Sequence, residues 1–248
     1  MDRMRACHCK TVVQMHMPSP TAYPPAGAAP LTQAGTAAAR KARFWDRIAR
    51  KYAADPIADT AGYEATLQRV QGLLSTDQDV LEIGCGTGTT AMRLAPLTRR
   101  LLATDVSAGM IAIAQEKLAA EPRPQLRFAV ADADEPAFGQ DAHDVALAFN
   151  VLHLVSDLDR ALALAVQALR PGGLLISKTP CIAEMNPLIP RLALPLMRAI
   201  GKAPHVLCFN GDALQSAITR QGLEVVSVER HGTRGKDIRV FILARKPA

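Results

Sequence analysis

The sequence predicts an α/β fold in which helices cover both faces of a mostly parallel, seven-stranded sheet, the doubly wound arrangement. Between residues 80 and 178, short apolar segments alternate with segments of helical periodicity, which is the pattern of parallel strands joined by helices. A glycine-rich turn follows the first of these apolar segments. The last two apolar segments are joined by a polar connection too short for a crossover helix, so we expect them to pair antiparallel.

The N-terminal part is expected to differ from the rest of the chain. Residues 1–39 are predicted to be a disordered tail, because they lack apolar periodicity and carry five prolines between Met17 and Pro30. The folded domain is expected over residues 40–248, beginning with a helical cover over residues 40–75. Apolar side chains recur there at helical spacing, and they are Phe44, Trp45, Ile48, Ala49 and Tyr52, followed by a second helix over Gly62–Leu74. For Trp45 and Tyr52, core packing is at least as good an interpretation as ligand contact.

The alternating part then supplies the sheet. Strands are expected at Val80–Ile83, Leu101–Thr104, Leu126–Val130, Val145–Phe149 and Leu174–Lys178, and helices near Thr89–Leu97, Ala108–Ala119 and Asp157–Leu169. The antiparallel strands are expected at Leu223–Val228 and Arg239–Ala244. Ligands of such folds bind beyond the carboxyl ends of the parallel strands. Gly84, Asp105, Asp132 and Asn150 all follow strand ends, so we expect them to line one crevice.

Charge and cysteine content narrow the classes of function. Residues 1–43 carry six Lys and Arg against one Asp, which leaves a net charge of +1 for residues 44–248. A nearly neutral folded part gives no support for a nucleic-acid partner. The five cysteines form no disulfide framework, and Cys7-His8-Cys9 lacks a second ligand pair, so we expect no metal. Cysteines without a disulfide framework fit a reducing compartment, so we expect a cytoplasmic protein. No apolar run is long enough to span a bilayer.

The turn after the first strand has the chemistry of a nucleotide-type cofactor loop. Three glycines at alternate positions, Gly84, Gly86 and Gly88, allow a ligand to approach the backbone closely. The dinucleotide pattern G-x-G-x-x-G requires a third glycine where this chain has Thr89, which weakens an NAD or FAD interpretation without removing it. Asp105 ends the second strand 21 residues after Gly84, a position suited to the hydroxyls of a ribose.

Five motifs in order make the chain resemble the class I S-adenosylmethionine-dependent methyltransferases over about residues 44–248. They are the loop Glu82-Ile83-Gly84-Cys85-Gly86-Thr87-Gly88, the acidic Asp105, the third-strand segment Val130-Ala131-Asp132-Ala133, the segment Asn150-Val151-Leu152-His153-Leu154 and the turn Leu169-Arg170-Pro171-Gly172-Gly173-Leu174. The resemblance implies a Rossmann-like fold in which the last strand is inserted antiparallel between the fifth and sixth.

The resemblance also implies that S-adenosyl-L-methionine is the cofactor and assigns its contacts. Glu82 and the glycine loop would hold the amino-acid portion, Asp105 the ribose, Met110 the adenine ring and Asp132 its amino group. For Met110, core packing is an equal alternative. The complete set of expected cofactor residues is Glu82, Gly84, Cys85, Gly86, Gly88, Asp105, Val106, Met110, Asp132, Ala133 and Asn150.

The expected reaction is in-line displacement of the cofactor's methyl group by a nucleophile of a small or lipid-like acceptor. His153 is the candidate general base, because an imidazole titrates near neutral pH. Residues 181–208 are strongly apolar and are predicted to form a lid over the acceptor that can also contact a membrane surface, with ordinary helix packing as the alternative. Two other functions stay open: an NAD-dependent oxidoreductase and a non-catalytic cofactor-binding relative.

Overall fold

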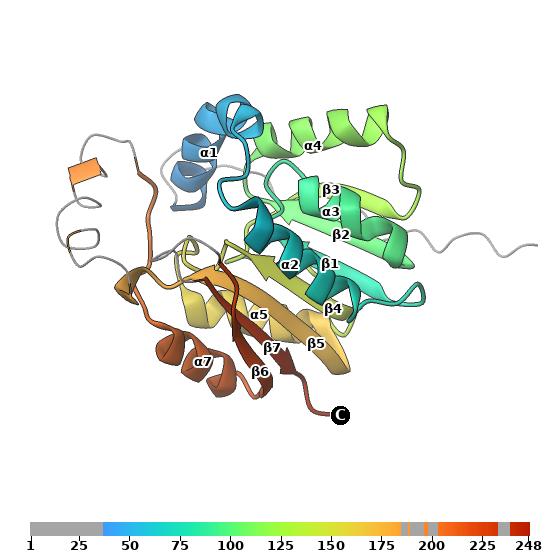
Figure 1. Ribbon diagram of the computed structural model, residues 1–248, viewed down its shortest axis with the longest axis vertical. Helices are drawn as coiled ribbons and strands as arrows, with labels where there is room; N and C mark the ends of the chain where they lie inside the picture. The colour runs from blue at the N-terminus through green and yellow to red at the C-terminus, as the bar shows by residue number, and fades with distance from the viewer. Residues whose placement is uncertain (1–36, 185–187, 189–195, 198–202, 233–238) are drawn as a thin grey trace, which may run out of the picture. The chain divides into compact units, whose positions relative to one another are not determined.

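A computed structural model describes residues 37–184, 188, 196–197, 203–232 and 239–248 of the chain (Figure 1). The elements run in the order α1 (Ala37–Ala54), α2 (Thr60–Gln71), β1 (Asp79–Ile83), α3 (Thr89–Leu94), a 3-10 turn (Ala95–Leu97), β2 (Arg100–Asp105), α4 (Ala108–Ala120), β3 (Leu126–Val130), β4 (His143–Phe149), α5 (Leu158–Ala168), β5 (Leu169–Pro180), a 3-10 turn (Ile182–Glu184), α7 (Gly211–Arg220), β6 (Glu224–Arg230) and β7 (Arg239–Arg245).

The sheet confirms the predicted fold class. Its seven strands lie in the order β3-β2-β1-β4-β5-β7-β6. The pairs from β3 to β5 are parallel, whereas β7 pairs antiparallel with both β5 and β6. The last strand is therefore inserted between the fifth and the sixth, as the resemblance implies. The carboxyl ends of β1, β2, β3 and β4 meet at one edge of the sheet.

Alternating side chains of each strand build two apolar cores, one on either face. Along β4, Ala146 and Ala148 belong to one core, and Val145 and Leu147 belong to the other. This alternation follows from the two-residue period of a strand. The first core includes apolar side chains of α5 and α7, and the second includes those of α2 and α3 (Figure 1). Both faces are covered, so β1 and β4, in the middle of the sheet, are buried along most of their length.

Helix α1 packs on α4 rather than directly on the sheet. Ala49 of α1 lies against Met110 and Ile113 of α4 in a small buried cluster. Polar contacts support this packing, since one carboxylate oxygen of Asp46 accepts hydrogen bonds from the Ser107 hydroxyl at 2.6 Å and the Gly109 amide at 2.8 Å. The first two turns of α4 and the middle of α1 are thus tied together.

The amino end of β1 carries a buried ionic cluster at the edge of the sheet opposite the crevice. Asp79 is fully buried, and its carboxylate accepts hydrogen bonds from Arg99, Arg100 and Arg170. Although burial alone would raise the pKa of Asp79, these three guanidinium groups hold it well below its usual range. A buried carboxylate with three cationic donors is compensated, and the cluster joins the starts of β1, β2 and β5.

Several expectations differ from the structure or fall outside the described residues. The predicted helix over Thr89–Leu97 is the short helix α3 followed by a 3-10 turn. Helix α7 was not predicted, although its sequence is amphipathic. The tail expected over residues 1–39 lies outside the described residues up to residue 36, as do Cys7-His8-Cys9 and most of the predicted lid over residues 181–208. None of the helices in the described part has the length and apolar character needed to cross a bilayer.

Candidate functional site

A cavity of about 740 Å³ lies at the carboxyl ends of β1 to β4, beneath α1. The structure brings ten of the eleven expected cofactor residues to its wall: Glu82, Gly84, Cys85, Gly86, Asp105, Val106, Met110, Asp132, Ala133 and Asn150. Gly88 and His153 do not line this cavity. Its volume lies within the range of roughly 300–1,000 Å³ that is typical of small-molecule sites.

The three glycines of the loop have different functions in the structure. All three have positive φ angles, of +71° at Gly84, +55° at Gly86 and +75° at Gly88. A side chain on Gly86 would have open space, with the Tyr52 ring nearest at 3.8 Å, so the backbone of Gly86 faces the cavity. A Cβ atom on Gly88 would instead lie 2.6 Å from Cζ of Phe128, inside the packing of β3. Gly88 thus allows α3 to begin close to the sheet, and Gly86 supplies the ligand-facing surface.

Asp105, at the end of the neighbouring strand β2, binds the backbone of the glycine loop. Its two carboxylate oxygens accept hydrogen bonds from the amides of Gly86 and Ser107, both at 2.9 Å. Burial raises the pKa of Asp105, and the two backbone donors oppose that rise. Because each carboxylate oxygen has two lone pairs, Asp105 retains acceptor capacity toward a ligand hydroxyl in the cavity. Ser107, the N-cap of α4, accepts a hydrogen bond from the Met110 amide, so capping does not require Asp105.

Glu82 is the most unusual group of the cavity wall. Its side chain is buried at the end of β1, and its Oε2 atom has no hydrogen-bond partner among the described residues. Burial, with a smaller contribution from the negative charge of Asp105, raises the pKa of Glu82 to about 8. A buried acceptor without a donor costs about 1–3 kcal/mol. The site therefore contains an acidic group that a cationic or hydrogen-bond-donating ligand would stabilise.

Asp132 meets a basic side chain that the sequence did not indicate. Lys41 of α1 places its Nζ atom 2.5 Å from the carboxylate of Asp132 and 2.7 Å from that of Asp134. All three side chains are largely buried. Asp134 also accepts hydrogen bonds from the amides of Ser156 and Asp157, which anchors the start of α5. Lys41 thus connects α1 to the loop after β3. It pairs with Asp132, the carboxylate that was expected to accept a hydrogen bond from the adenine amino group.

Two further basic residues line the opposite part of the cavity. Lys178, near the end of β5, is buried and donates to the carbonyl of Gly62 at 3.1 Å and the hydroxyl of Thr66 at 2.7 Å. Arg239, at the start of β7, donates to Oδ1 of Asn150 at 2.7 Å. Asn150 itself has a positive φ of +55°, which Asn tolerates better than most residues. Neither Lys178 nor Arg239 belongs to a motif, so only the sheet register could have indicated that they line the cavity.

The expected general base, His153, does not line the cofactor cavity. His153 is half-buried, and its Nδ1 atom is buried without a hydrogen-bond partner among the described residues. Burial, and secondarily the positive charge of Arg239, lowers the pKa of His153 to about 4. Sequence position alone could not reveal this burial, and the role of His153 as a base stays a prediction.

Aromatic side chains of α1 complete the cavity from above. Trp45 and Tyr52 both line it, and their rings make an edge-to-face contact with centroids 6.3 Å apart. The connection between α1 and α2, residues 55–59, extends this wall. Trp45 also packs against the cluster between α1 and α4. Trp45 therefore both packs in this cluster and lines the cavity, and contact with a ligand stays a prediction.

Comparison with known protein families gives one domain match. Residues 80–173 match the family described as "Methyltransferase domain". These residues include β1, β2, β3, β4 and the start of β5, and hence the glycine loop and the strand ends that line the cavity. The match does not extend to α1 or to the C-terminal strands.

Individual proteins similar to this chain extend the comparison. The O-methyltransferase cnsE of Penicillium expansum is 28% identical over 194 residues, which cover 75% of this chain and 65% of cnsE. The crystal structure of the [4+2]-cyclase SpnF covers 84% of this chain and 95% of its own, with 19% identity and a TM-score of 0.67. A phosphoethanolamine N-methyltransferase of Haemonchus contortus covers 84% of this chain and 60% of its own, with 17% identity and a TM-score of 0.67. The chain thus spans less than two thirds of the length of the curated relatives that it first matches.

Proposed function

Because this chain belongs to the class I S-adenosylmethionine-dependent methyltransferases, we propose that it transfers the methyl group of S-adenosylmethionine to a small or lipid-like acceptor. The observation that carries this proposal is the acidic pair at the cavity wall, in which Glu82 is buried and Asp105 is half-buried. Glu82 and Asp105 present carboxylate oxygens beside a glycine backbone that has room for a ligand.

The residues of the cavity fit this cofactor. The unpartnered Oε2 atom of Glu82 suits the ammonium group of the amino-acid portion, and pairing with a cation would return the pKa of Glu82 toward its ordinary value. Asp105 has spare acceptor capacity for ribose hydroxyls. Met110, Val106 and Ala133 supply an apolar wall that suits adenine. Asp132 would accept from the adenine amino group while Lys41 retains its pairing with Asp134.

The cofactor supplies a methyl group that is bonded to a positively charged sulfur. The sulfur is a good leaving group when the methyl group is transferred. The residues of this chain then need chiefly to hold two reactants in line, which supplies up to roughly 7–11 kcal/mol of the barrier in favourable systems. Helix α1, with Trp45 and Tyr52 at the cavity, would exclude water from the reactants. No histidine is among the described residues that line the cavity.

Two observations support a small acceptor: the size of the site and the names of similar proteins. The cavity volume of about 740 Å³ suits a small molecule beside the cofactor. The Haemonchus enzyme is solved with phosphomonomethylethanolamine and S-adenosylhomocysteine, and cnsE is named an O-methyltransferase. We keep the proposal that residues 181–208 form a lid over the acceptor, because their apolar side chains would exclude water.

One alternative function deserves a direct test. The solved cyclase has the same fold as this chain, and a fold does not determine a reaction. A relative that binds the cofactor without transferring its methyl group is therefore the competing proposal. Binding and transfer must be measured separately.

The experiment combines calorimetry with a transfer assay. We expect S-adenosylhomocysteine to bind the full chain and NADH not to bind. Asp105→Asn should weaken that binding by roughly 10- to 100-fold, because a charge-assisted hydrogen bond is worth about 1.5–3 kcal/mol. Asp159→Asn is the matched control, since Asp159 is an exposed carboxylate paired with Arg220. Methyl-labelled cofactor with a cell extract should then yield a labelled small molecule.

Each failure has a distinct meaning. Binding without a labelled product in any extract would favour the non-transferring relative. Binding of NADH with indifference to S-adenosylhomocysteine would favour the oxidoreductase and refute the proposed function.

A further inference from the structure

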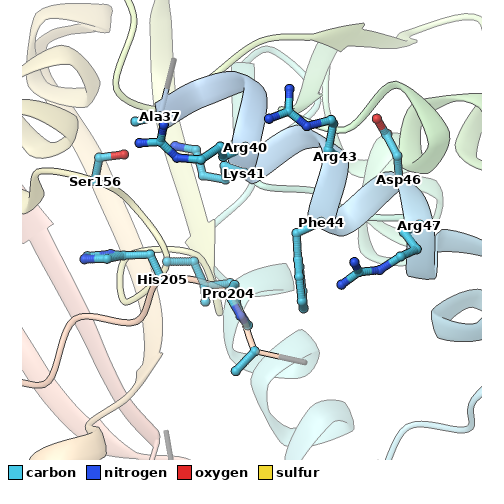
Figure 2. A pocket seen from close by; sticks show the side chains of 12 residues that line it. Ala37, Arg40, Lys41, Arg43, Phe44, Asp46, Arg47, Ser156, Pro204 and His205 are labelled. Atoms are coloured by element: carbon cyan, nitrogen blue, oxygen red, sulfur yellow. The ribbon is translucent and has the colours of Figure 1, made fainter. Parts of the chain in front are cut away.

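Lys41 of α1 lies at the border between the cofactor cavity and a second cavity. The second cavity is lined by α1 and residues 203–205, and Figure 2 shows Lys41 extending from α1 near Ser156. Lys41 and Leu154 line both cavities. Only 12% of the Lys41 side chain is exposed. Ligand cavities use a small number of such fixed polar groups to orient what they bind.

The hydrogen bonds of Lys41 leave one donor of its ammonium group available. Its Nζ atom donates to Asp132 at 2.5 Å and to Asp134 at 2.7 Å. An ammonium group has three N–H donors, and the described part of the chain gives Lys41 no third acceptor. The third N–H can therefore serve a ligand in the cofactor cavity.

The two carboxylates that bind Lys41 have different surroundings. Asp134 accepts hydrogen bonds from the amides of Ser156 and Asp157 and does not line the cofactor cavity. Asp132 does line it and accepts, besides the bond from Lys41, one from the amide of Asp134 at 3.2 Å. A carboxylate has about four lone-pair sites, so Asp132 can accept a further hydrogen bond. Asp134 thus holds the ammonium group in place, and Asp132 puts an acceptor directly beside it.

An acceptor and a donor side by side match one edge of an adenine ring. The amino group of adenine donates hydrogen bonds, and the adjacent ring nitrogen N1 accepts one. Hypoxanthine reverses this pattern, because a carbonyl oxygen replaces the amino group and N1 carries a proton. Proteins recognise a single base by hydrogen bonds to this edge and by apolar contacts to its faces. Met110, Ala133 and Leu154 supply apolar side chains at the same cavity wall.

We infer that Lys41 donates a hydrogen bond to N1 of the adenine ring of the cofactor and so determines base specificity, an inference that rests on the proposed function. Asp132 accepts from the amino group of the same ring, so the two side chains recognise two adjacent atoms. Lys41 belongs to α1, which lies outside the residues that match the methyltransferase domain. Recognition of the base is thus shared between the sheet and the helix that covers the cavity.

Calorimetric titration of the full chain with paired ligands tests this inference. S-adenosylhomocysteine is compared with its 1-deaza analogue, in which a C–H group replaces N1. The wild type should bind the 1-deaza analogue about 10- to 100-fold more weakly, because a charge-assisted hydrogen bond is lost. In Lys41→Met, which has no donor, the two affinities should agree within about twofold. S-inosylhomocysteine, which carries hypoxanthine, should bind the wild type more weakly than both.

The matched control is Lys51→Met, on the same helix. Lys51 is exposed, pairs with Asp55 and does not line the cofactor cavity, so this variant should keep the wild-type ratio of the two affinities. Because each ratio compares two ligands on one protein, a general loss of affinity or of folded protein cancels. Equal binding of the two ligands by the wild type would overturn the inference without any variant. A Lys41→Met protein that keeps the wild-type ratio would also overturn it, since another donor would then serve N1.

Adenosine and 1-deazaadenosine separate this inference from the proposed function. If S-adenosylhomocysteine does not bind, but adenosine binds and its advantage over 1-deazaadenosine disappears in Lys41→Met, the proposed function fails and Lys41 recognises adenine in another ligand. If S-adenosylhomocysteine binds with an affinity that does not depend on N1, the proposed function stands and Lys41 only connects α1 to the loop after β3. If neither S-adenosylhomocysteine nor adenosine binds, both are wrong.

Discussion

At the scale of single residues, Glu82 shows how a ligand site differs from a folded core. A buried carboxyl group without a hydrogen-bond donor destabilises the protein that contains it. Here burial raises the pKa of Glu82 to about 8, so the free protein keeps this group protonated at neutral pH. Such a group is a candidate for ligand binding, because a ligand can supply the hydrogen-bond donor that the protein lacks.

This raised pKa predicts a pH dependence of stability. The folded-state pKa of Glu82 lies above the ordinary value of 4.5, so its stabilising contribution is complete below that value and is lost as pH rises toward 8. The loss amounts to about 1.4 kcal/mol per pH unit. We expect Glu82→Gln, which cannot ionise, to abolish this slope. The measurement is urea unfolding of both proteins without ligand between pH 5 and 8.

The informative quantity is the difference between the two unfolding curves. His153 has a lowered pKa and acts in the opposite direction, because its contribution is lost as pH falls from 6.5 toward 4. It is present in both proteins and cancels in the difference. Glu116→Gln, which changes an exposed carboxylate, should show the wild-type slope. Parallel curves for the wild type and Glu82→Gln would contradict the assignment.

His153 gives a second prediction at this scale. Because its imidazole is neutral and lies away from the cavity wall, we expect His153→Gln to change kcat by less than about threefold. Loss of a true general base costs about 10²- to 10⁴-fold. Transfer rates with saturating cofactor, measured across pH 6 to 9, distinguish the two cases. A hundredfold fall in kcat with unchanged S-adenosylhomocysteine affinity would restore His153 as the base.

At the scale of elements, the glycine turn couples packing to ligand access. Gly88 begins α3 with a φ of +75°, and a Cβ atom there would meet Phe128 at 2.6 Å and Ala114 at 2.8 Å. We expect Gly88→Ala to lower the free energy of unfolding by about 2–4 kcal/mol, because backbone strain and overpacking add. Chemical denaturation measures this loss.

Gly172→Ala provides the matched control for backbone strain alone. Gly172 has a φ of +78°, but a Cβ atom there would meet nothing within 4 Å. This variant should lose only about 1 kcal/mol. Equal losses in the two variants would show that contact with β3 does not explain the requirement for glycine at position 88.

The strands and their ends were predictable from sequence, because their signals are local, whereas helix α7 was not predicted. Apolar alternation located all seven strands, and the glycine spacing located the loop. Lys41, Lys178 and Arg239 were not predictable, because each reaches the cavity from an element far along the chain. The lowered pKa of His153 could not be predicted from the sequence either, since burial is a property of the packed structure.

At the scale of the whole molecule, the site is assembled from two parts. The sheet supplies the acidic strand ends, and α1 supplies the roof with Trp45 and Tyr52. Three contacts made by α1 hold this roof in place. Lys41 pairs with the loop after β3, and Asp46 accepts hydrogen bonds from α4. The third contact is the exposed ion pair of Arg50 with Glu116 of α4. A ligand that contacts both parts should therefore stabilise the docking of α1.

Hydrogen exchange of α1 tests this coupling. We expect Asp46→Ala to speed the exchange of amides in residues 44–54 about 30-fold, because two hydrogen bonds worth about 1 kcal/mol each are lost. Saturating S-adenosylhomocysteine should slow the same amides in both proteins. Amides of β5, in the middle of the sheet, should change little in either comparison.

Arg50→Gln is the variant with which Asp46→Ala is compared. It also removes a contact between α1 and α4, but an exposed ion pair contributes only about 0–1 kcal/mol, so the acceleration should be smaller than for Asp46→Ala. If calorimetry shows S-adenosylhomocysteine bound and the amides of α1 still exchange at their free rates, α1 is not a roof that the ligand holds. The cavity would then have to be closed by residues outside α1, and the role of Trp45 and Tyr52 would be packing alone.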